Sequence, residues 1–478
     1  MYDIAIIGCG IIGAAAAYEL SKYELRVAVI ERENDIADET TKANSGIVHA
    51  GYDPKPGSAM AACNVDGAKQ IRELCKKLSV HYRQCGSLVV AFNEQDKASL
   101  LRLYEQGIQN GVVDMRILSA DAAHDMEPNL SSEVCSALYA PSAAIVDPWE
   151  LCIALAETAA QNGVDFYLNS EVLFIEKAAG MYILHTQDKT LLAKYIVNAA
   201  GVQADLVHQM VDKPAFHITP IKGEYFLLDK NHGTLVNHII FQCPGINGKG
   251  VLVSPTVHGN LIVGPNAEET PDRNDVSTTM EGLQYIKKAA ARSVPGINYR
   301  DCIRTFAGVR AQSDCYDFII EESPERFINL AGIRSPGLSA SPAISKKCLS
   351  LLQTAGLLLS PKKNVVDSRS VIRFRELPVE QKIALVKENS LYGRVICRCE
   401  TVTEGEIVAA LRRPVSPSTV DGIKKRCNAG MGRCQGGFCG PKIAAIISRE
   451  RKIPIEEILL NKQGTVLLVG ETKNHGTV

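Results

Sequence analysis

Three glycines close to the start of the chain have the spacing of a dinucleotide-binding turn. They are Gly8, Gly10 and Gly13, placed between an apolar run at residues 2–7 and an Ala-rich helical segment at residues 14–20. In such a unit the first glycine allows a tight turn and the second lets a pyrophosphate approach the backbone. The third lets the helix pack against the sheet. The sequence therefore predicts a dinucleotide whose phosphates lie at a helix N-terminus.

The residue that ends the next apolar run supports this prediction. Residues 25–30 read as a second strand, and Glu31 follows directly. At that position a carboxylate can accept hydrogen bonds from both hydroxyls of a ribose. The glycine spacing and the acid do not distinguish FAD from NAD.

Four cysteines near the other end of the chain could bind metal. Cys397 and Cys399 form one close pair, and Cys434 and Cys439 form a second. Two thiolate pairs brought together by folding suit either an iron–sulfur cluster or a zinc ion. Cys427 lies outside the pairs and is expected to be a spare thiol. Ten further cysteines are scattered singly, as expected for small buried apolar residues in a reducing cytoplasm.

Composition excludes several function classes. The 478 residues are 46% hydrophobic and 22% charged, with a net charge of −1. These values indicate a soluble protein of two or three domains and give no sign of nucleic-acid binding. No apolar run is long enough to span a bilayer. Because the nucleotide unit begins at residue 2, we expect no signal peptide and a cytoplasmic location. Peripheral attachment to the inner face of a membrane through a partner is compatible with this.

The order of expected helices and strands predicts an α/β fold. A Rossmann-like, nucleotide-binding part is expected at about residues 1–80, 145–215 and 320–360. Between residues 216 and 270, strands separated by Gly, Asn and Pro turns predict an inserted antiparallel sheet that walls a substrate pocket. We expect residues 1–370 to form an oxidoreductase, with its substrate-binding part at residues 81–144 and 216–319. A linker at residues 371–393 is expected to lead to a small, mainly helical Cys-cluster domain at residues 394–455. A tail at residues 456–478 follows.

Several motifs occur in the order typical of one flavoprotein superfamily. They are the glycine turn, Asn44-Ser45-Gly46, residues 198–201 and the loop at residues 332–339. Over residues 1–360 the chain resembles the D-amino-acid-oxidase/glycerol-3-phosphate dehydrogenase group. The resemblance implies FAD, because the later loops contact the ribityl chain and flavin in that group. The cofactor-binding residues that it implies are Gly8, Gly10, Ile11, Ile12, Gly13, Glu31, Arg32, Thr41, Asn44, Ser45, Gly46, Val172, Ala200, Gly201, Gly332, Gly337, Leu338 and Ser339.

The chemistry of that group is hydride transfer to flavin from a carbon that carries a hydroxyl or an amine. The protein must remove a proton and hold an acidic substrate. His49 lies in the loop expected beside the flavin, where a neutral imidazole can act as the base. Arg310 lies in a segment similar to those that hold the substrate anion in the family, and a guanidinium suits that task. Arg334 is expected at the surface or beside the flavin.

Three further residues are candidates for the catalytic site. Lys222, Glu224 and Tyr225 lie on the inserted sheet, at a segment that matches the family. Alternation along a strand puts Lys222 and Glu224 on the same face. That face lines either the pocket or solvent.

The cysteine segment resembles a second family. Residues 397–400 and 430–439 are similar to the 2Fe–2S domain of bacterioferritin-associated ferredoxin, over about residues 394–450. A similar domain follows the flavin domain in the large subunit of anaerobic glycerol-3-phosphate dehydrogenase. The resemblance implies a cluster that accepts single electrons and passes them to a protein partner. Zinc would only brace the fold.

Together these resemblances predict an FAD-dependent dehydrogenase that oxidises sn-glycerol 3-phosphate to dihydroxyacetone phosphate. Electrons would leave through the cluster to another subunit. Residues 45–51 and 222–225 also look like those of L-2-hydroxyglutarate dehydrogenases, so a 2-hydroxy acid is the alternative substrate. A non-catalytic electron-transfer or assembly subunit and an oxidase that reduces oxygen directly are the remaining alternatives.

Overall fold

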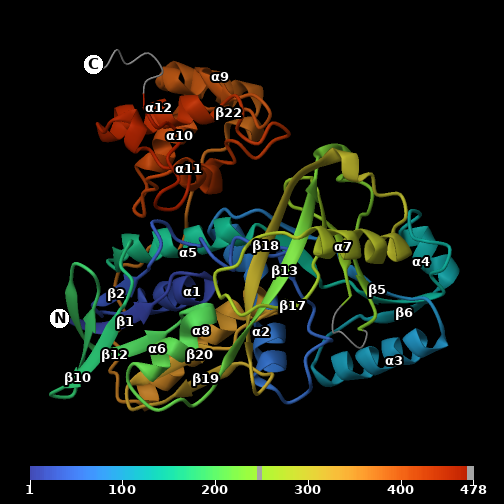
Figure 1. Cartoon of the computed structure of the whole chain (residues 1–478), viewed down its shortest axis with the longest axis horizontal. Helices are drawn as coiled ribbons and strands as arrows, with labels where there is room; N and C mark the ends of the chain where they lie inside the picture. Colours follow the sequence, from blue (N-terminus) through green and yellow to red (C-terminus); the bar gives the residue numbers. More distant parts are fainter. Residues whose placement is uncertain (245–249, 471–478) are drawn as a thin grey trace, which may run out of the picture.

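The computed structural model describes residues 1–244 and 250–470. Of the expected tail at 456–478, residues 471–478 lie outside the described residues. Figure 1 shows two sheet-containing parts side by side, with a third, helical part above the first. Among the helices of the described residues, none combines the length and the apolar character needed to cross a bilayer.

The first part is built on a mainly parallel sheet. Its strands lie in the order β10-β11-β12-β1-β2-β9, and β20 also pairs with β12. β1 lies between β12 and β2, parallel to both. The strand bounds are β1 Tyr2–Ile7, β2 Val27–Ile30, β9 Asp165–Tyr167, β10 Phe174–Ala178, β11 Met181–His185, β12 Thr190–Asn198, β19 Ile319–Glu322 and β20 Phe327–Ala331. The carboxyl ends of the central strands therefore meet at one edge, where ligands bind in open α/β sheets.

Helices α1, α5 and α8 pack together beside this sheet, and α2 packs on α8. Their bounds are α1 Ile11–Leu20, α2 Ala59–Lys77, α5 Pro148–Gln161, α6 Ala204–Gln209 and α8 Gly337–Thr354. Alanines on the buried helix α1 allow its close approach to α5 and α8. α8 begins at Gly337 and includes Pro342. The hydroxyl of Ser341 donates to the Leu338 carbonyl at 3.0 Å, which supplies a donor for an oxygen that the proline nitrogen cannot serve.

The second part is a nine-stranded, mostly antiparallel sheet. Its order is β17-β13-β16-β15-β14-β5-β7-β6, with β18 on the other edge of β13. The long strands β13 and β18 run antiparallel and join the two parts of the molecule (Figure 1). Strand bounds are β5 Ser87–Ala91, β6 Arg116–Ser119, β7 Ser136–Ala140, β13 Ile218–Leu228, β14 Ile239–Gln242, β15 Leu252–Pro255, β16 Leu261–Gly264, β17 Glu268–Glu269 and β18 Cys302–Ser313. Helices α3 Glu94–Gln109, α4 Ala120–Met126 and α7 Met280–Ser293 cover it.

A small three-stranded sheet connects the two parts. It is formed by β3 Ile47–Val48, β4 Tyr82–Gln84 and β8 Ala144–Val146, with β8 in the centre. β3 carries the chain directly into His49, so this small sheet fixes the position of that residue relative to both larger sheets.

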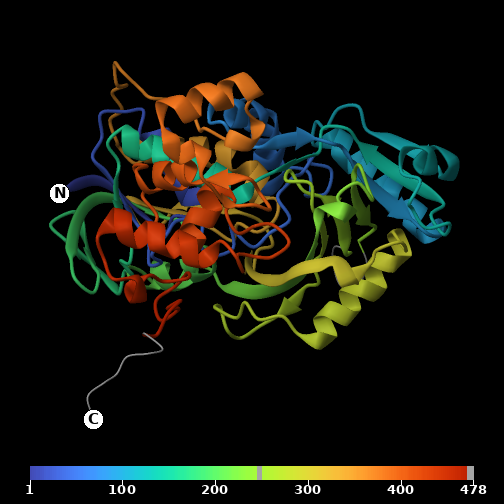
Figure 2. The same ribbon diagram turned by 90° about the horizontal axis from the view of Figure 1, so that it is seen from above.

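The third part, residues 374–470, is called the C-terminal domain here. Its elements are α9 Val379–Glu388, β21 Val395–Cys397, β22 Val402–Thr403, α10 Glu404–Leu411, α11 Val420–Cys427 and α12 Gly440–Arg451. They enclose a small apolar core of their own. Part of the expected linker, residues 371–393, forms α9 and packs through a short 3₁₀ turn at Ser390–Gly393 on α10. Figure 2 shows these orange and red helices lying over the first part of the molecule.

Candidate functional site

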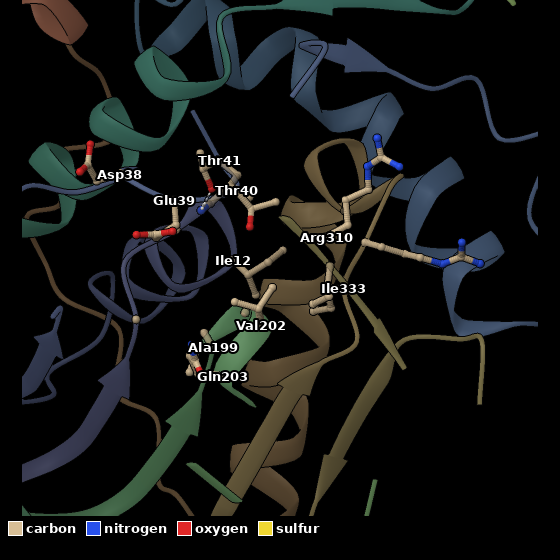
Figure 3. Close-up of a pocket in the computed structure, with 18 of the residues that line it drawn as sticks. Ile12, Asp38, Glu39, Thr40, Thr41, Ala199, Val202, Gln203, Arg310 and Ile333 are labelled. Carbon is tan, nitrogen blue, oxygen red and sulfur yellow. Dashed lines mark hydrogen bonds between the residues drawn. The ribbon is translucent and has the colours of Figure 1, made fainter. Parts of the chain in front are cut away.

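A cavity of about 420 Å³ lies where the first sheet ends and the second begins. It is lined by the glycine turn, by residues of the loop that follows β2, by the start of the segment after β12 and by the segment that leads into α8. Figure 3 shows Thr41, Ala199 and Val202 near Ile12, with Arg310 and Ile333 on the side away from Asp38. The cavity is thus elongated, with the glycine turn and the arginine in different regions.

The glycine turn has the close approaches that its spacing predicts. Gly8 has a φ of +96°, and a β-carbon there would lie 2.6 Å from the Ala199 carbonyl oxygen. A β-carbon at Gly13 would clash with the Gly8 carbonyl. Gly10 precedes α1 and lines the cavity, and the Ile11 N–H, the first of the helix, donates to Thr41 Oγ1 at 2.9 Å. The N-terminal end of α1 therefore lies at the cavity, as a pyrophosphate requires.

Glu31 lies beside this turn and is buried. Its two carboxylate oxygens accept hydrogen bonds from the backbone N–H groups of Cys9, at 2.6 Å, and Glu33, at 3.0 Å. Burial raises the pKa of Glu31 to about 7, against the effect of these two hydrogen bonds. These two donors do not offset the cost of burying the carboxylate, and the hydroxyls of a ribose would supply further donors. The residues present therefore fit the adenosine half of a dinucleotide.

Two arginines lie in the cavity. Arg310 projects from β18 past Gly223, where a β-carbon would clash with the guanidinium, and donates to the Asn266 carbonyl at 3.3 Å. Burial lowers the pKa of Arg334, the charge of Asp53 opposes this, and the charge of Arg310 lowers it further. The two guanidiniums are thus close enough to repel each other, and an anion in the cavity would relieve that repulsion.

His49 lines the same cavity and is held by two serines. Its backbone N–H donates to Ser339 Oγ at 2.8 Å, and its ring Nε2 lies 3.0 Å from Ser335 Oγ. Its ring also stacks on Phe241 with 5.7 Å between centroids. Ser339 itself is buried and does not line the cavity, so it positions His49 without reaching a ligand there.

Most residues expected to bind the cofactor line this one cavity, and so do three of the catalytic candidates. The lining residues are Gly8, Gly10, Ile11, Ile12, Glu31, Arg32, Thr41, Asn44, Ser45, Val172, Ala200, Gly201, Gly337, Leu338, His49, Tyr225 and Arg310. Four others shape the backbone or position a neighbour behind the lining. They are Gly13, Gly46, Gly332 and Ser339.

Lys222 and Glu224 are not among the lining residues. The Lys222 ammonium pairs with Asp275 at 2.7 Å, and its side chain is almost fully buried. Glu224 accepts hydrogen bonds from the backbone N–H and the hydroxyl of Thr279, at 2.9 and 2.8 Å, at the start of α7. Alternation along β13 puts Tyr225 on the cavity side and both charged residues on the other.

Sequence reasoning missed several lining residues. Ser335 lies inside the Gly-rich segment that was expected to contact the flavin, so that segment was the signal for it. Arg334, named from the sequence as a surface or flavin-side charge, lines the cavity. Val202 and Gln203 follow Gly201 directly, in a short 3₁₀ helix. The remaining set carries no sequence signal, because it depends on where loops meet, and it includes Asp38, Glu39, Ser170, Glu171, Leu206, Met210 and Asn274.

The four cysteines of the C-terminal domain form two pairs. Cys399 Sγ and Cys434 Sγ are 3.7 Å apart, towards the surface. Cys397 and Cys439 are buried, and a hydrogen bond from Cys439 lowers the pKa of Cys397 to about 6. The Gly430 N–H also donates to Cys397 Sγ at 3.5 Å, and a β-carbon at Gly432 would clash with Cys399.

The two pairs supply four thiolates, two for each iron of a two-iron cluster, and four thiolates suit zinc as well. The Cys427 thiol donates to the Ile423 carbonyl at 3.3 Å, and burial raises its pKa to about 12. That Cys427 is a spare thiol stays a prediction.

Comparison with known proteins agrees with these sites. A glycerol 3-phosphate dehydrogenase of Caloramator mitchellensis is 48% identical over 477 residues, which are 99% of each chain. A glycerol 3-phosphate oxidase of Mycoplasma genitalium is 36% identical over 361 residues, 73% of this chain and 94% of the oxidase. An L-2-hydroxyglutarate dehydrogenase of Escherichia coli (strain K12) is 29% identical over 419 residues, 78% of this chain and 98% of that protein.

Among solved structures, the dithionite-reduced L-alpha-glycerophosphate oxidase of Mycoplasma pneumoniae with FAD bound has a TM-score of 0.74 and 34% identity. The match covers 78% of this chain and 99% of the oxidase. Residues 3–350 match the family of FAD dependent oxidoreductases, and residues 395–449 match the BFD-like [2Fe-2S] binding domain. The chain therefore belongs to the FAD dependent oxidoreductase family and carries a BFD-like [2Fe-2S] binding domain after its flavoprotein fold.

Proposed function

We propose that this protein oxidises sn-glycerol 3-phosphate to dihydroxyacetone phosphate and passes the electrons through its iron–sulfur cluster to a partner protein. The observation that carries the proposal is the pair Arg310 and Arg334 in one cavity with His49. Two neighbouring guanidiniums suit the double negative charge of a phosphate monoester. The dehydrogenase that is similar over the full length supports this choice of substrate.

Within this proposal each residue of the cavity has a role. Glu31 and Val172 would hold the adenosine half of FAD, and the segments that contain Asn44 and Leu338 would hold the flavin half. When bound, FAD supplies the acceptor for the hydride that leaves the substrate carbon. The protein's own residues orient the substrate and take up a proton from it.

The proton balance assigns His49. Oxidation of the secondary alcohol breaks the C–H bond with its electron pair and the O–H bond with loss of a proton. Arg310 and Arg334 hold the phosphate, and His49 accepts the hydroxyl proton at Nε2. Since Ser335 Oγ lies 3.0 Å from that nitrogen, the serine can hold the ring in place before the substrate arrives.

The partner would take electrons at the exposed side of the cysteine site. Cys399 is exposed, and Phe438, next to Cys439, is 83% exposed. Arg398, next to Cys399 in the chain, and Lys442, three residues after Cys439, are exposed, so an acceptor protein with an acidic surface fits this edge.

Anaerobic titration of the purified protein, followed at the flavin absorbance band, tests the substrate. We expect glycerol 3-phosphate to bleach the band and L-2-hydroxyglutarate to leave it unchanged. Bleaching by the hydroxy acid alone would assign the other substrate, and no bleaching by either would indicate a non-catalytic subunit. Peroxide formed in step with substrate in air would indicate an oxidase.

Two variants separate binding from proton transfer. Arg310→Ala should raise KM for glycerol 3-phosphate by about 100-fold, as the loss of a charged hydrogen bond implies. His49→Gln should lower the rate of flavin bleaching about 100-fold or more at saturating substrate. Arg102→Ala, at an exposed position on α3, is the matched control and should change neither.

A further inference from the structure

The loop at residues 33–41, which follows β2, belongs to the FAD cavity. Glu39 and Thr41 line the cavity, and Thr41 Oγ1 accepts a hydrogen bond from the Ile11 N–H at 2.9 Å. The Ala37 N–H donates to the Cys9 carbonyl at 3.1 Å, and Ala37 has a φ of +57°. The loop is therefore tied at two points to the glycine turn, in a backbone conformation that needs outside support.

Helix α11 of the C-terminal domain supplies that support. Arg426 donates to both carboxylate oxygens of Asp35, at 2.9 and 2.8 Å, from a side chain with no solvent exposure. Lys425 donates to the Ile36 carbonyl and to Asp38, each at 3.0 Å. Gly422 allows the close contact, because a β-carbon there would lie 3.1 Å from Asp35 Oδ2. Every residue from 35 to 38 thus lies against α11 or the glycine turn.

The positive charges of Arg426 and Lys425 stabilise the ionised form of Asp35 across this contact. Although burial alone raises it, the charges of Arg426 and Lys425 hold the pKa of Asp35 well below its usual range. If α11 moved away, Asp35 would lose both cations, and the carbonyl of Ile36 and the carboxylate of Asp38 would lose the Lys425 ammonium. Residues 35–38 would then keep their contacts with the glycine turn and within the loop but lose those with α11.

A second contact reaches the same loop from residues that follow α12. Asn34 Nδ2 donates to the Asn461 carbonyl at 2.5 Å, and Lys462 pairs with Glu39 at 2.5 Å and with Glu33 at 3.3 Å. Because the Lys462 side chain is 41% exposed, its ion pairs stabilise the docking of the C-terminal domain less than the buried contact of α11 does.

We propose that α11 of the iron–sulfur domain holds the FAD-binding loop in its binding conformation through Arg426–Asp35 and Lys425–Asp38. FAD binding and docking of the C-terminal domain are then linked: each stabilises the other. By thermodynamic reciprocity, the factor by which docking tightens FAD binding equals the factor by which FAD tightens docking. Arg426 and Lys425 are positioning residues, since neither lines the FAD cavity.

Equilibrium FAD binding to the full-length protein tests this link. FAD is removed reversibly and titrated back while flavin fluorescence is followed. Arg426→Met should weaken binding by about tenfold or more, equivalent to about 1.4 kcal/mol. The double variant Asp35→Asn/Arg426→Met should bind FAD about as weakly as Arg426→Met alone, because both variants lack the same pair. Arg412→Met removes an exposed arginine paired with Glu450 in the same domain and should bind FAD as the native chain does.

Hydrogen exchange on the native chain gives a second readout that needs no variant. We expect the amides of residues 420–427 to exchange about tenfold faster without FAD than with it, since the link acts in both directions. Equal FAD affinity in native and Arg426→Met proteins that keep their cluster would overturn the proposal. If Arg426→Met failed to fold, the exchange experiment on the native chain would decide. Equal exchange rates of the α11 amides with and without FAD would then overturn the proposal.

Discussion

At the scale of residues, the positions of the side chains that face the cavity are fixed by neighbouring residues that do not face it. Arg310 can extend into the cavity because position 223 has no side chain, and His49 is held from behind by Ser339. Both neighbours were in segments that the sequence singled out. Their roles could not be predicted, because a hydrogen bond between residues 290 positions apart depends on how the loops meet.

Gly223 gives a direct test of how Arg310 is positioned. Gly223→Ala would put a methyl group in the space of the guanidinium and displace it. We expect KM for glycerol 3-phosphate to rise about tenfold or more while the rate at saturating substrate changes little. Gly296→Ala is the control, since a β-carbon there meets only Leu235 at 3.9 Å. An unchanged KM in steady-state assays would show that Arg310 does not hold the substrate.

Glu31 predicts how FAD affinity depends on pH. Burial raises the pKa of Glu31 to about 7 in the FAD-free protein, whereas hydroxyl donors from a ribose favour the ionised form. Below pH 7, FAD binding must therefore release a proton, which weakens it. As pH rises from 5 to 7, the dissociation constant for FAD should fall by up to about tenfold per pH unit, and above pH 7 it should stay constant. Glu31→Gln should bind more weakly and lose this dependence. A flat pH profile for the native chain would exclude contact between Glu31 and the cofactor.

At the scale of elements, local patterns predicted most of what positions the cavity. The unit β1–α1–β2 was expected in the right order, because an apolar run, a glycine turn and an alanine-rich helix are consecutive in the chain. The expected bounds of β1 are exact, whereas α1 begins at Ile11 instead of residue 14 and β2 at Val27 instead of residue 25. The sequence did not predict which face of β13 lines the cavity. Alternation correctly puts Lys222 and Glu224 together, but the direction that they face depends on α7, which packs against β13 from more than fifty residues away.

The structure predicts a structural effect for Glu224. Glu224→Ala would remove a buried carboxylate and leave the Thr279 N–H and hydroxyl without their acceptor at the start of α7. The loss should be on the order of 1–3 kcal/mol, seen as a drop of several degrees in Tm. Substrate KM and the rate of flavin bleaching should stay near native in the protein that remains folded. A native Tm with a large fall in bleaching rate would instead assign Glu224 to the chemistry.

At the scale of the whole molecule, the C-terminal domain is more than an appended electron carrier. Its contact with the first part includes the buried pair of Arg426 and Asp35, which are 391 residues apart in the chain. No periodicity or motif relates two single charges at such a separation, so the sequence predicted the domain but not its place. The same contact brings the iron–sulfur domain against the loop that lines the FAD cavity.

Electron counting tests whether the two cofactors act in one molecule. FAD takes up two electrons and a 2Fe–2S cluster takes up one, so anaerobic reductive titration of the native chain should consume about three electrons per chain. Cys434→Ser removes a ligand from the exposed pair and should lower this to about two electrons per bound FAD, counted after unbound FAD has been removed. Cys427→Ser, at the thiol expected to be spare, should leave the count at about three. If the native chain took up only two electrons and its metal proved to be zinc, the thiolate pairs would serve structure alone. Electrons would then have to leave directly from the flavin cavity.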